Sequence, residues 1–417
     1  MKDKKLKEII DNIFEYIPLK YNSVEKIKRA GGRIYLVGGA SRDIILGRKP
    51  SDFDFTILGF SEKQFQEKFP EAKPVGNSFK VFKFQGHDFS LNRKEFTENQ
   101  NVTRTNSVYK NTIIEDLRTR DFTINALAID LIDKKLIDPF QGIKDLHKGI
   151  IKSLPQAFIK DPLRVYRACR FVCELSNGFN NYFKITNETR KQMKKVKSQL
   201  NNIYPERVFK EFRKALNSKF PELFFIELEK SEILKVHFPE IFNLKHIPQP
   251  EKYHPEGDVF NHTIQCLKAS VKETDREIVR FGVLVHDLGK ALTPPQELPH
   301  HYNHEKRGVS LLNNLSKRLK LPRKWKQSGK LAITEHLKGY RWTEMRPGKI
   351  VKLLKKARKS PLGVKGLKKV VICDRKGRGN IKTNLSQIEN LDKFAEKLFS
   401  EIDASSIKNV SEGPEMG

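Results

Sequence analysis

A strand, two glycines and a helix start follow one another near the N-terminus, and this junction constrains the fold more than any other feature. The apolar run Ile34–Val37 is typical of a short buried strand. Gly38 and Gly39 permit a tight turn, and we expect a helix to open at Arg42 with Ser41 as its N-cap. Backbone N–H groups at such a corner attract anions, so the sequence predicts a phosphate-binding site there.

Two aspartates follow this corner at a spacing that suits metal binding. Asp52 and Asp54 lie in an alternating run, so we expect both carboxylates on one face of a strand, with Phe53 and Phe55 in the core. A Gly-Gly pair is most often only a turn, and Asp-x-Asp is common on exposed strand edges. Their order within about twenty residues favours a two-metal phosphoryl- or nucleotidyl-transfer site. Asp88 lies in another alternating run and would add a third carboxylate if the strands pair in the right register.

The charge of the chain indicates a polyanionic partner. Its 417 residues carry a formal net charge of +30 with a pI near 9.8, which favours nucleic acid, although a lysine-rich proteome would account for part of the excess. The four cysteines form no CxxC pair, so we expect buried, reduced thiols. No apolar run reaches membrane-spanning length, and the N-terminus is unlike a signal peptide. We therefore expect a cytoplasmic protein with no membrane partner.

Changes in pattern along the chain divide it into five segments. An α/β pattern follows amphipathic helices and gives way to an all-helical region and then to a histidine-rich helical region. Polar residues at 94–117 predict an irregular loop beside the site, and residues 403–417 predict a disordered tail. The segments are an N-terminal helical extension (1–31), a head (32–145), a helical neck and body (146–245), a histidine-rich domain (246–376) and a C-terminal helical segment with its tail (377–417).

Two arginine-containing segments are candidates for contact with a nucleotide. Arg120 and Asp121 open a predicted helix, where they are either internal scaffolding or a clamp on a triphosphate or ribose. Asp161 precedes a proline at another predicted helix start, and Arg164 and Arg167 share one face of that helix. This row is either a basic stripe facing solvent or RNA phosphate, or a reader of base edges, which a carboxylate and a guanidinium can match.

Histidine and aspartate residues recur through the histidine-rich domain. His286 and Asp287 are adjacent in an apolar run, where burial is costly without a metal or partners. A lone histidine there would more often be a satisfied core residue. With the upstream His262 and the downstream Asp374, however, the pair forms a ligand set typical of a divalent transition metal in a hydrolytic site. Two further histidines, His304 and His336, are candidate ligands of a second metal. His300 and His301 are expected to belong to a polar loop.

Together these motifs resemble a known family. Five runs are similar to the successive motifs of class II tRNA nucleotidyltransferases and bacterial poly(A) polymerases: LVGGASRDIILGRKPSDFDF, RTRDFTINALAID, DPFQGIKDL, DPLRVYRACRF and PERVFKEF. The pattern of His262, HDLGK and Asp374 resembles an HD phosphohydrolase domain. The order of the motifs over residues 33–376 resembles that of the bacterial HD-domain-containing CCA-adding enzymes. The resemblance implies an α+β fold, with a mixed-sheet head, an all-helical neck and body, and a helical HD domain.

The resemblance also implies roles for individual residues. Asp52 and Asp54 would bind the catalytic Mg²⁺, with Asp88 as a third carboxylate. The residues expected to hold the nucleotide are Gly38, Gly39 and Arg42 at the triphosphate, Arg120 and Asp121 at the sugar and phosphates, and Asp161, Arg164 and Arg167 at the base. Two positions depart from the family pattern: Ser41 stands where a valine-like residue is usual, and Thr119 where a second arginine is usual. The ligands expected for a divalent transition metal in the HD domain are His262, His286, Asp287 and Asp374.

The implied function is template-independent addition of CCA to the 3′ end of tRNA from CTP and ATP, with an additional phosphohydrolase activity in the HD domain. Within the same class, A-only addition and poly(A) tailing stay open, although the HD domain favours the tRNA enzyme. A different class is an HD-domain phosphatase or phosphodiesterase that acts on RNA ends as its main activity. A catalytically inactive RNA-binding protein is disfavoured, because every expected carboxylate is present.

Overall fold

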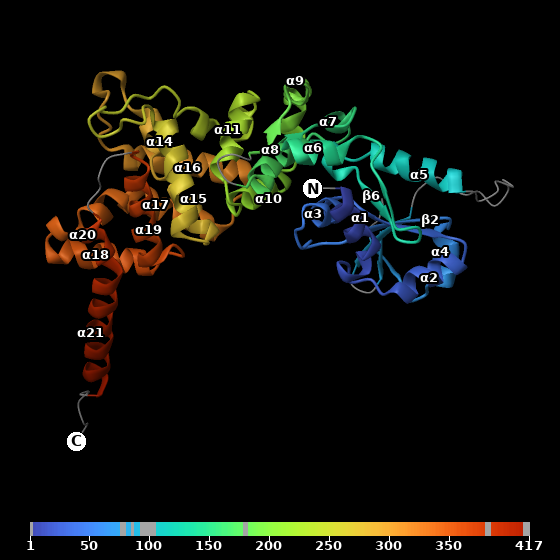
Figure 1. The fold of residues 1–417 in the computed structure, drawn as a ribbon. Helices are drawn as coiled ribbons and strands as arrows, with labels where there is room; N and C mark the ends of the chain where they lie inside the picture. The colour runs from blue at the N-terminus through green and yellow to red at the C-terminus, as the bar shows by residue number, and fades with distance from the viewer. Residues whose placement is uncertain are drawn as a thin grey trace. The chain divides into compact units, whose positions relative to one another are not determined.

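The computed structural model describes residues 3–75, 81–84, 87–91, 106–177, 182–379 and 385–411 (Figure 1). The chain divides into two compact units: the first contains residues 1–164 and 179–192, and the second contains residues 165–178 and 193–417. The named strands all belong to the first unit, and the named elements of the second unit are helices. No helix among the described residues has both the length and the hydrophobicity that crossing a membrane requires.

The first unit is built on a seven-stranded mixed sheet with strand order β3-β4-β5-β2-β1-β6-β7. The strands are β1 (Arg33–Val37), β2 (Asp54–Leu58), β3 (Lys73–Val75), β4 (Val81–Phe84), β5 (His87–Leu91), β6 (Ala128–Asp130) and β7 (Lys135–Ile137). Within this sheet, β2 and β5 are the parallel pair and the other neighbours are antiparallel. The parallel register places Asp54 opposite Asp88.

Helices cover the two faces of this sheet. The helices named in this unit before α8 are α1 (Asp3–Asp11), η1 (Ile13–Glu15), α2 (Tyr21–Arg29), α3 (Gly39–Ile45), α4 (Glu62–Lys68), α5 (Asn106–Arg118), η2 (Thr123–Asn125), α6 (Gly142–Lys148) and α7 (Ala157–Lys160). Ile34 and Leu36 of β1 face a core shared with α1, α2, α3 and α4, whereas Tyr35 and Val37 face a smaller core shared with α5. Since Phe55 enters the larger core, Asp54 points to the α5 side of the sheet.

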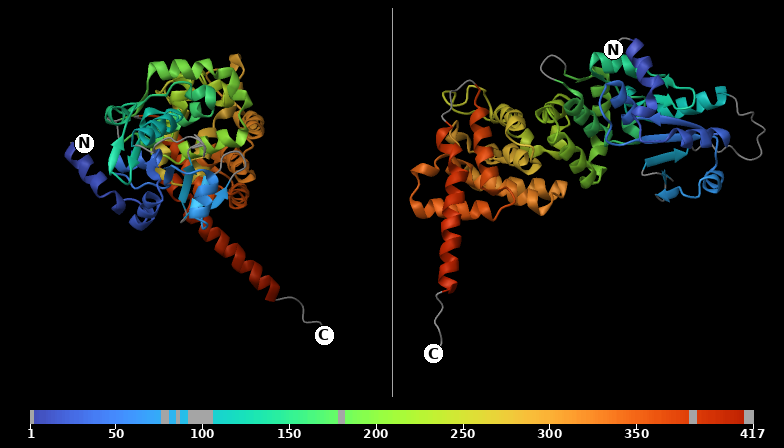
Figure 2. Two further views of the ribbon diagram at one scale, coloured as in Figure 1. Left: turned by 90° about the vertical axis from the view of Figure 1, so that its right-hand side faces the viewer. Right: turned by 60° about the horizontal axis from the view of Figure 1, so that its bottom comes forward.

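The second unit is helical; α8 belongs to it from Val165 onward, and α9 belongs to it only from Met193 onward. Its helices are α8 (Arg164–Leu175), α9 (Asn187–Lys195), η3 (Lys197–Asn202), α10 (Pro205–Leu216), α11 (Glu222–Lys230), α12 (Leu234–His237), α13 (Pro239–Phe242), α14 (Val259–Glu273), α15 (Glu277–Val285), η4 (Leu288–Leu292), η5 (Pro295–Glu297), α16 (His304–Leu319), α17 (Arg323–Tyr340), η6 (Trp342–Glu344), α18 (Pro347–Arg358), α19 (Gly363–Lys376), α20 (Ser386–Glu389) and α21 (Leu391–Ser411). Val283 of α15, Ala332 of α17 and Val370 of α19 share one core. In Figures 1 and 2, α21 extends away from the other helices of this unit.

The α+β class is confirmed, but the helix after the glycine corner begins earlier than predicted. Gly38, with a φ of +72°, takes the N-cap position, and α3 starts at Gly39. Ser41 is therefore not the cap: its Oγ turns inward and donates to Leu36 O at 2.8 Å. The helix predicted to open at Arg120 is also wrong, because only the short η2 follows there.

Three other local predictions are corrected. The segment 94–117 includes α5 from Asn106 onward, while its earlier part up to residue 105 lies outside the described residues. The predicted all-helical region contains a short parallel pair, β8 (Ile150–Ile151) with β9 (Lys184–Ile185). The predicted tail is helical over residues 403–411, because α21 continues to Ser411. The division into five segments stays a prediction. The first boundary between the two compact units lies between residues 164 and 165, which is inside the predicted neck and body (146–245).

Candidate active sites

Gly38 lies at the corner between β1 and α3, where any side chain would enter the space of the site. A Cβ at this position would lie 3.3 Å from Arg120 Nη1 and 3.9 Å from Asp54 Oδ2. The positive φ of Gly38 is itself a conformation that residues with side chains rarely adopt. The glycine therefore keeps open a space with a guanidinium on one side and a carboxylate on the other.

Asp54 and Asp88 present their carboxylates on the same face of the sheet. They are register partners in β2 and β5, and neighbouring strands lie about 4.8 Å apart. Phe55 and Phe89, the next residues of each strand, stack on the opposite face with ring centroids 5.1 Å apart. Both aspartates are exposed, and Lys83 Nζ lies 3.9 Å from Asp88 Oδ1. The third carboxylate predicted for the site thus lies beside Asp54.

Asp52 lies in the segment before β2, so the prediction that both aspartates belong to one strand is wrong. It is exposed, and its Oδ2 accepts a 3.4 Å hydrogen bond from Ser51 Oγ. A common orientation of the Asp52 and Asp54 carboxylates stays a prediction. Within the described residues, groups of three or more side chains close enough to share one ion occur only between residues 254 and 374. The head carboxylates are therefore neighbours rather than a closed ligand cage.

Arg42 and Asp121 are joined through Asn125 in a buried chain of hydrogen bonds. Arg42 Nη1 donates to Asn125 Oδ1 at 2.7 Å, and Asn125 Nδ2 donates to Asp121 Oδ1 at 2.9 Å. Arg42 Nε also donates to Asp43 Oδ1 at 2.8 Å. These bonds tie α3 to η2 behind the glycine corner. Asn125 was missed by the sequence analysis; its place in the run RTRDFTINALAID was the available signal.

Arg164, the first residue of α8, holds the backbone that carries Arg120. Its Nη1 donates to Arg120 O at 3.0 Å and to Ala157 O at 3.2 Å, and its Nη2 donates to Thr119 O at 3.0 Å. Arg120 Nη2 in turn donates to Asp116 Oδ2 at 2.9 Å. The structure thus brings together two of the segments predicted to bind the nucleotide.

The other residues predicted to read the base lie near the start of α8. Asp161 Oδ1 accepts a 3.1 Å hydrogen bond from the backbone N–H two residues later, just before the helix. The Arg167 guanidinium lies 5.4 Å from the centre of the Phe171 ring. Arg170, one turn further on, is buried and donates to Glu211 Oε2 at 2.6 Å, so it stabilises helix packing. The roles of Asp161 and Arg167 toward a nucleotide stay predictions.

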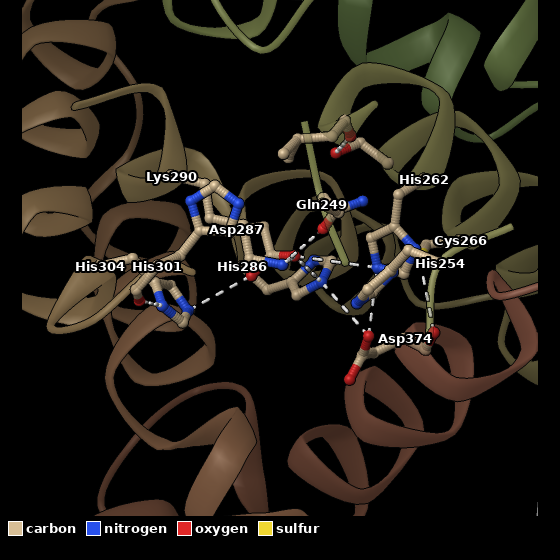
Figure 3. A network of polar contacts seen from close by, with 12 residues as sticks. Gln249, His254, His262, Cys266, His286, Asp287, Lys290, His301, His304 and Asp374 are labelled. Carbon is tan, nitrogen blue, oxygen red and sulfur yellow. Dashed lines mark hydrogen bonds and ion pairs between the residues drawn. The ribbon is translucent and has the colours of Figure 1, made fainter. Parts of the chain in front are cut away.

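The histidine and aspartate residues of the second unit converge in one buried centre (Figure 3). They come from five parts of the unit: His262 from α14, His286 and Asp287 from the end of α15, His304 from α16, His336 from α17 and Asp374 from α19. His262 Nε2 lies 3.1 Å and His286 Nε2 lies 3.8 Å from Asp374 Oδ1. All four predicted metal ligands and both candidates for a second metal therefore meet. His300 and His301 lie in the loop before α16.

Asp287 faces two groups of nitrogen atoms, one with each carboxylate oxygen. Its Oδ2 lies 3.3 Å from His286 Nε2 and 2.7 Å from Lys290 Nζ. Its Oδ1 lies 3.3 Å from His304 Nε2 and 3.6 Å from His336 Nε2. Burial alone would raise the pKa of Asp287, but His286 and Lys290 hold that pKa well below its ordinary value. Asp287 is thus an ionised carboxylate that can contact two cations at once.

Backbone carbonyls orient three of these histidines. Nδ1 of His286, His304 and His336 lies 2.7, 2.8 and 3.0 Å from a carbonyl oxygen three or four residues earlier. Because a carbonyl only accepts, each Nδ1 carries a proton, and loss of the Nε2 proton from such a ring would leave a lone pair on Nε2. Burial lowers the pKa of His336 to about 3, which keeps that ring neutral. His286 Nε2, His304 Nε2 and Asp287 Oδ1 are buried without a hydrogen-bond partner, as ligands of a divalent cation would be.

Three residues that were not predicted complete the centre. Glu256 Oε1 lies 2.6 Å from His262 Nδ1 and 2.8 Å from His254 Nδ1. Burial would raise the pKa of Glu256, but the hydrogen bonds from both histidines lower it to about 2. Cys266 lies one helical turn after His262, with Sγ 3.3 Å from His262 Nε2. The four-residue spacing was a signal for Cys266, whereas no periodic pattern links Glu256 to the site.

Family models match three successive parts of the chain. "Poly A polymerase head domain" matches residues 34–152, "Probable RNA and SrmB-binding site of polymerase A" matches residues 182–244, and "HD domain" matches residues 259–373. Their order agrees with the predicted head, body and histidine-rich domain. Both the head and the HD type of domain imply dependence on divalent metal ions.

Solved structures of CCA-adding enzymes share the fold. The Thermotoga maritima CCA-adding enzyme complexed with tRNA is 21% identical, with a TM-score of 0.57, and the match covers 89% of this chain and 79% of that one. A complex of a CCA-adding enzyme with CTP is also 21% identical, with a TM-score of 0.59 and coverage of 94% and 85%. A third structure holds ATP, at 21% identity, a TM-score of 0.58 and coverage of 90% and 81%.

Curated relatives are closer in sequence. The multifunctional CCA protein of Acinetobacter baumannii is 37% identical over 355 residues, which cover 83% of this chain and 84% of the relative. The multifunctional CCA protein of Legionella pneumophila is 37% identical over 328 residues, with coverage of 77% and 78%. Together with the order of the matched domains, this similarity shows that the chain belongs to the family of multifunctional CCA proteins, as the sequence motifs indicated.

Proposed function

We propose that this chain adds C, C and A to the 3′ end of tRNA from CTP and ATP without a template. The observation that carries the proposal is the corner at Gly38, where the Arg120 guanidinium and the Asp54 carboxylate both approach the glycine at which a triphosphate is expected. The name of the relatives, and the tRNA, CTP and ATP bound to the structural neighbours, support the same substrates. Because tRNA is the substrate, we expect the protein in the cytoplasm.

The head would hold Mg²⁺ and the triphosphate at this corner. Asp52, Asp54 and Asp88 are the proposed metal ligands, and the exposed oxygens of Asp54 and Asp88 on one sheet face fit this hard cation. When bound, Mg²⁺ activates the RNA 3′-hydroxyl and neutralises the leaving pyrophosphate. The proposed contacts to the triphosphate and sugar come from Gly38, Gly39, Arg42, Arg120 and Asp121.

Asp161 and Arg164, supported by Arg167, would select the incoming base through its hydrogen-bonding edge. Arg164 also donates to the carbonyl of Arg120. If Arg164 moves when it contacts a base, this hydrogen bond would also shift Arg120, which is proposed to lie beside the triphosphate. This connection gives a physical route by which the correct base could favour the reactive placement of its own α-phosphate.

The test is to incubate the protein with tRNA that lacks its CCA end and to size the products. With CTP alone we expect the RNA to stop after two C residues, and with CTP and ATP together we expect addition to stop after the terminal A. A ladder of A residues from ATP alone would instead support poly(A) tailing. A single A added only to tRNA already ending in CC would support A-only addition.

We also propose that the HD domain is a metal-dependent phosphohydrolase acting on nucleotides or RNA ends. The buried Nε2 atoms of His286 and His304, directed at Asp287 and without hydrogen-bond partners, favour it. A divalent transition metal suits the imidazole ligands. His262, His286, Asp287 and Asp374 would hold it, and His304 and His336 are candidates to hold a second ion. His286→Ala should abolish metal-dependent hydrolysis of a 2′,3′-cyclic nucleotide and leave CCA addition intact. Hydrolysis that survives in this variant would contradict the assignment.

A further inference from the structure

Cys266 brings a sulfur atom to the edge of the buried centre in the second unit. It lies four residues after His262 on α14, so both side chains leave the same face of the helix. Its Sγ lies 3.3 Å from His262 Nε2 and 3.8 Å from the backbone oxygen of Asp374. Figure 3 shows Cys266 beside His262. The potential ligand atoms of His262, Cys266, His286 and Asp374 all lie within 4.8 Å of one another.

The separations within this group suit a shared cation. His262 Nε2 lies 3.1 Å from Asp374 Oδ1, and His286 Nε2 lies 3.8 Å from the same oxygen. A tetrahedral ion with bonds of about 2.0–2.3 Å keeps its ligand atoms roughly 3.3–3.8 Å apart. His286 Nε2 is fully buried and has no hydrogen-bond partner, so it is an independent sign that the group is built around a ligand.

The end of α19 leaves room for the sulfur. A Cβ at Gly377 would lie 2.2 Å from Cys266 Sγ and 2.9 Å from the Cys266 backbone nitrogen, so no larger residue fits there without movement. The other half of the centre differs, because Asp287 Oδ1, His304 and His336 supply only oxygen and nitrogen. The two halves therefore offer different donor sets.

We propose that Cys266 supplies a sulfur ligand to the ion held by His262, His286 and Asp374, so that this half of the centre selects a thiophilic divalent cation such as Zn²⁺ over Mg²⁺. The S–H bond breaks as the sulfur–metal bond forms, and the proton leaves to solvent. This inference rests on the proposed metal centre of the HD domain.

The test uses the full chain, freed of metal with a chelator and titrated with Co²⁺ as a spectroscopic substitute for Zn²⁺. The unmodified protein should develop visible ligand-field bands together with a near-ultraviolet sulfur-to-cobalt charge-transfer band. Cys266→Ala should keep the visible bands and lose the charge-transfer band, and its Zn²⁺ affinity, measured against a chromophoric chelator, should fall at least about tenfold. Cys169→Ala, which removes another buried cysteine of the same unit, should behave like the unmodified protein.

Cys266→Ser keeps the size of the side chain and should also lose the charge-transfer band. This second variant provides the test if Cys266→Ala folds poorly. Visible bands without a charge-transfer band in the unmodified protein would overturn the sulfur ligand and leave the proposed metal centre standing. A charge-transfer band that persists in both variants would overturn it as well. Failure of the unmodified protein to bind Co²⁺ at all would overturn both the sulfur ligand and the metal centre.

Discussion

Asp54 is the carboxylate that lies beside the glycine corner, so removing its charge tests metal binding with little change in shape. We expect Asp54→Asn to reduce nucleotide addition at least about 100-fold, because the variant lacks a proposed ligand of the ion that would stabilise the transition state. Binding of tRNA should persist, since phosphate contacts do not depend on this residue. Incorporation of labelled ATP and filter binding measure the two properties.

The control is Glu71→Gln, which removes an exposed carboxylate of the same unit that pairs only loosely with Lys26. Its nucleotide addition should match that of the unmodified protein. Normal incorporation by Asp54→Asn would contradict the assignment of the head site.

Gly38 and Gly47 allow backbone strain to be separated from obstruction of the site. Both have positive φ values, +72° and +68°, but a Cβ meets Arg120 and Asp54 at the first position and nothing within 4 Å at the second. Gly38→Ala and Gly47→Ala should each lower the free energy of unfolding by about 1–2 kcal/mol. Only Gly38→Ala should raise the KM for nucleotide, measured by steady-state kinetics. Equal KM values for the two variants would show that the corner is not the nucleotide site.

At the scale of elements, Asn125 connects α3 to η2 through its bonds to Arg42 and Asp121. Asn125→Ala would take a hydrogen bond from two buried charged groups, so we expect a loss of about 1–3 kcal/mol in the free energy of unfolding. Urea denaturation followed by circular dichroism measures it. The exposed Asn217, which donates to Glu277 in the second unit, provides the comparison: Asn217→Ala should cost much less.

Alternation was sufficient to predict that Asp54 and Asp88 share one face of the sheet, but the sequence did not predict the local geometry of the glycine corner. The apolar positions of β2 and β5 predicted which face Asp54 and Asp88 share, because a two-residue period leaves only one choice once the core side is known. The helix start at Gly39 was missed because Ser41 resembles a cap in sequence, whereas Gly38 fills that position and Ser41 bonds inward. A serine can either cap a helix or donate its hydroxyl to a buried carbonyl, and only tertiary contacts distinguish the two roles.

In the buried centre of the second unit, most site residues could be predicted from the sequence, but one in an irregular segment could not. Its histidines and aspartates were predicted because polar groups in apolar helices are costly to bury. Glu256 was not, because it lies in the segment before α14, where no periodicity reports burial. The helix α5 was missed for a related reason: its polar composition hides the apolar stripe of Ile113 and Leu117. The two-residue strands β8 and β9 are too short to leave any pattern.

At the scale of the whole molecule, the net charge of +30 predicts how binding responds to salt. Each phosphate contact releases condensed counterions, so four or more contacts would weaken tRNA binding roughly 100-fold between about 50 and 200 mM salt. Filter binding over a salt series gives the slope. The Asp54→Asn variant should follow the same slope, since the contacts it retains are those to phosphate. A flat titration would show that the basic surface does not hold RNA.

The parallel pairing of β2 with β5 sets the earliest moment at which the Asp54 and Asp88 carboxylates can lie together. Thr56 and Ser90, which contact each other across these strands, are 34 residues apart in the chain, and α4, β3 and β4 lie between them. A strand pair this distant in sequence cannot close as a hairpin. On the ribosome, the growing polypeptide therefore carries the glycine corner well before it carries Asp88. Until Leu91 has emerged from the exit tunnel, a nascent chain therefore lacks the strand that pairs with Asp54 and the Asp88 carboxylate proposed as its neighbour.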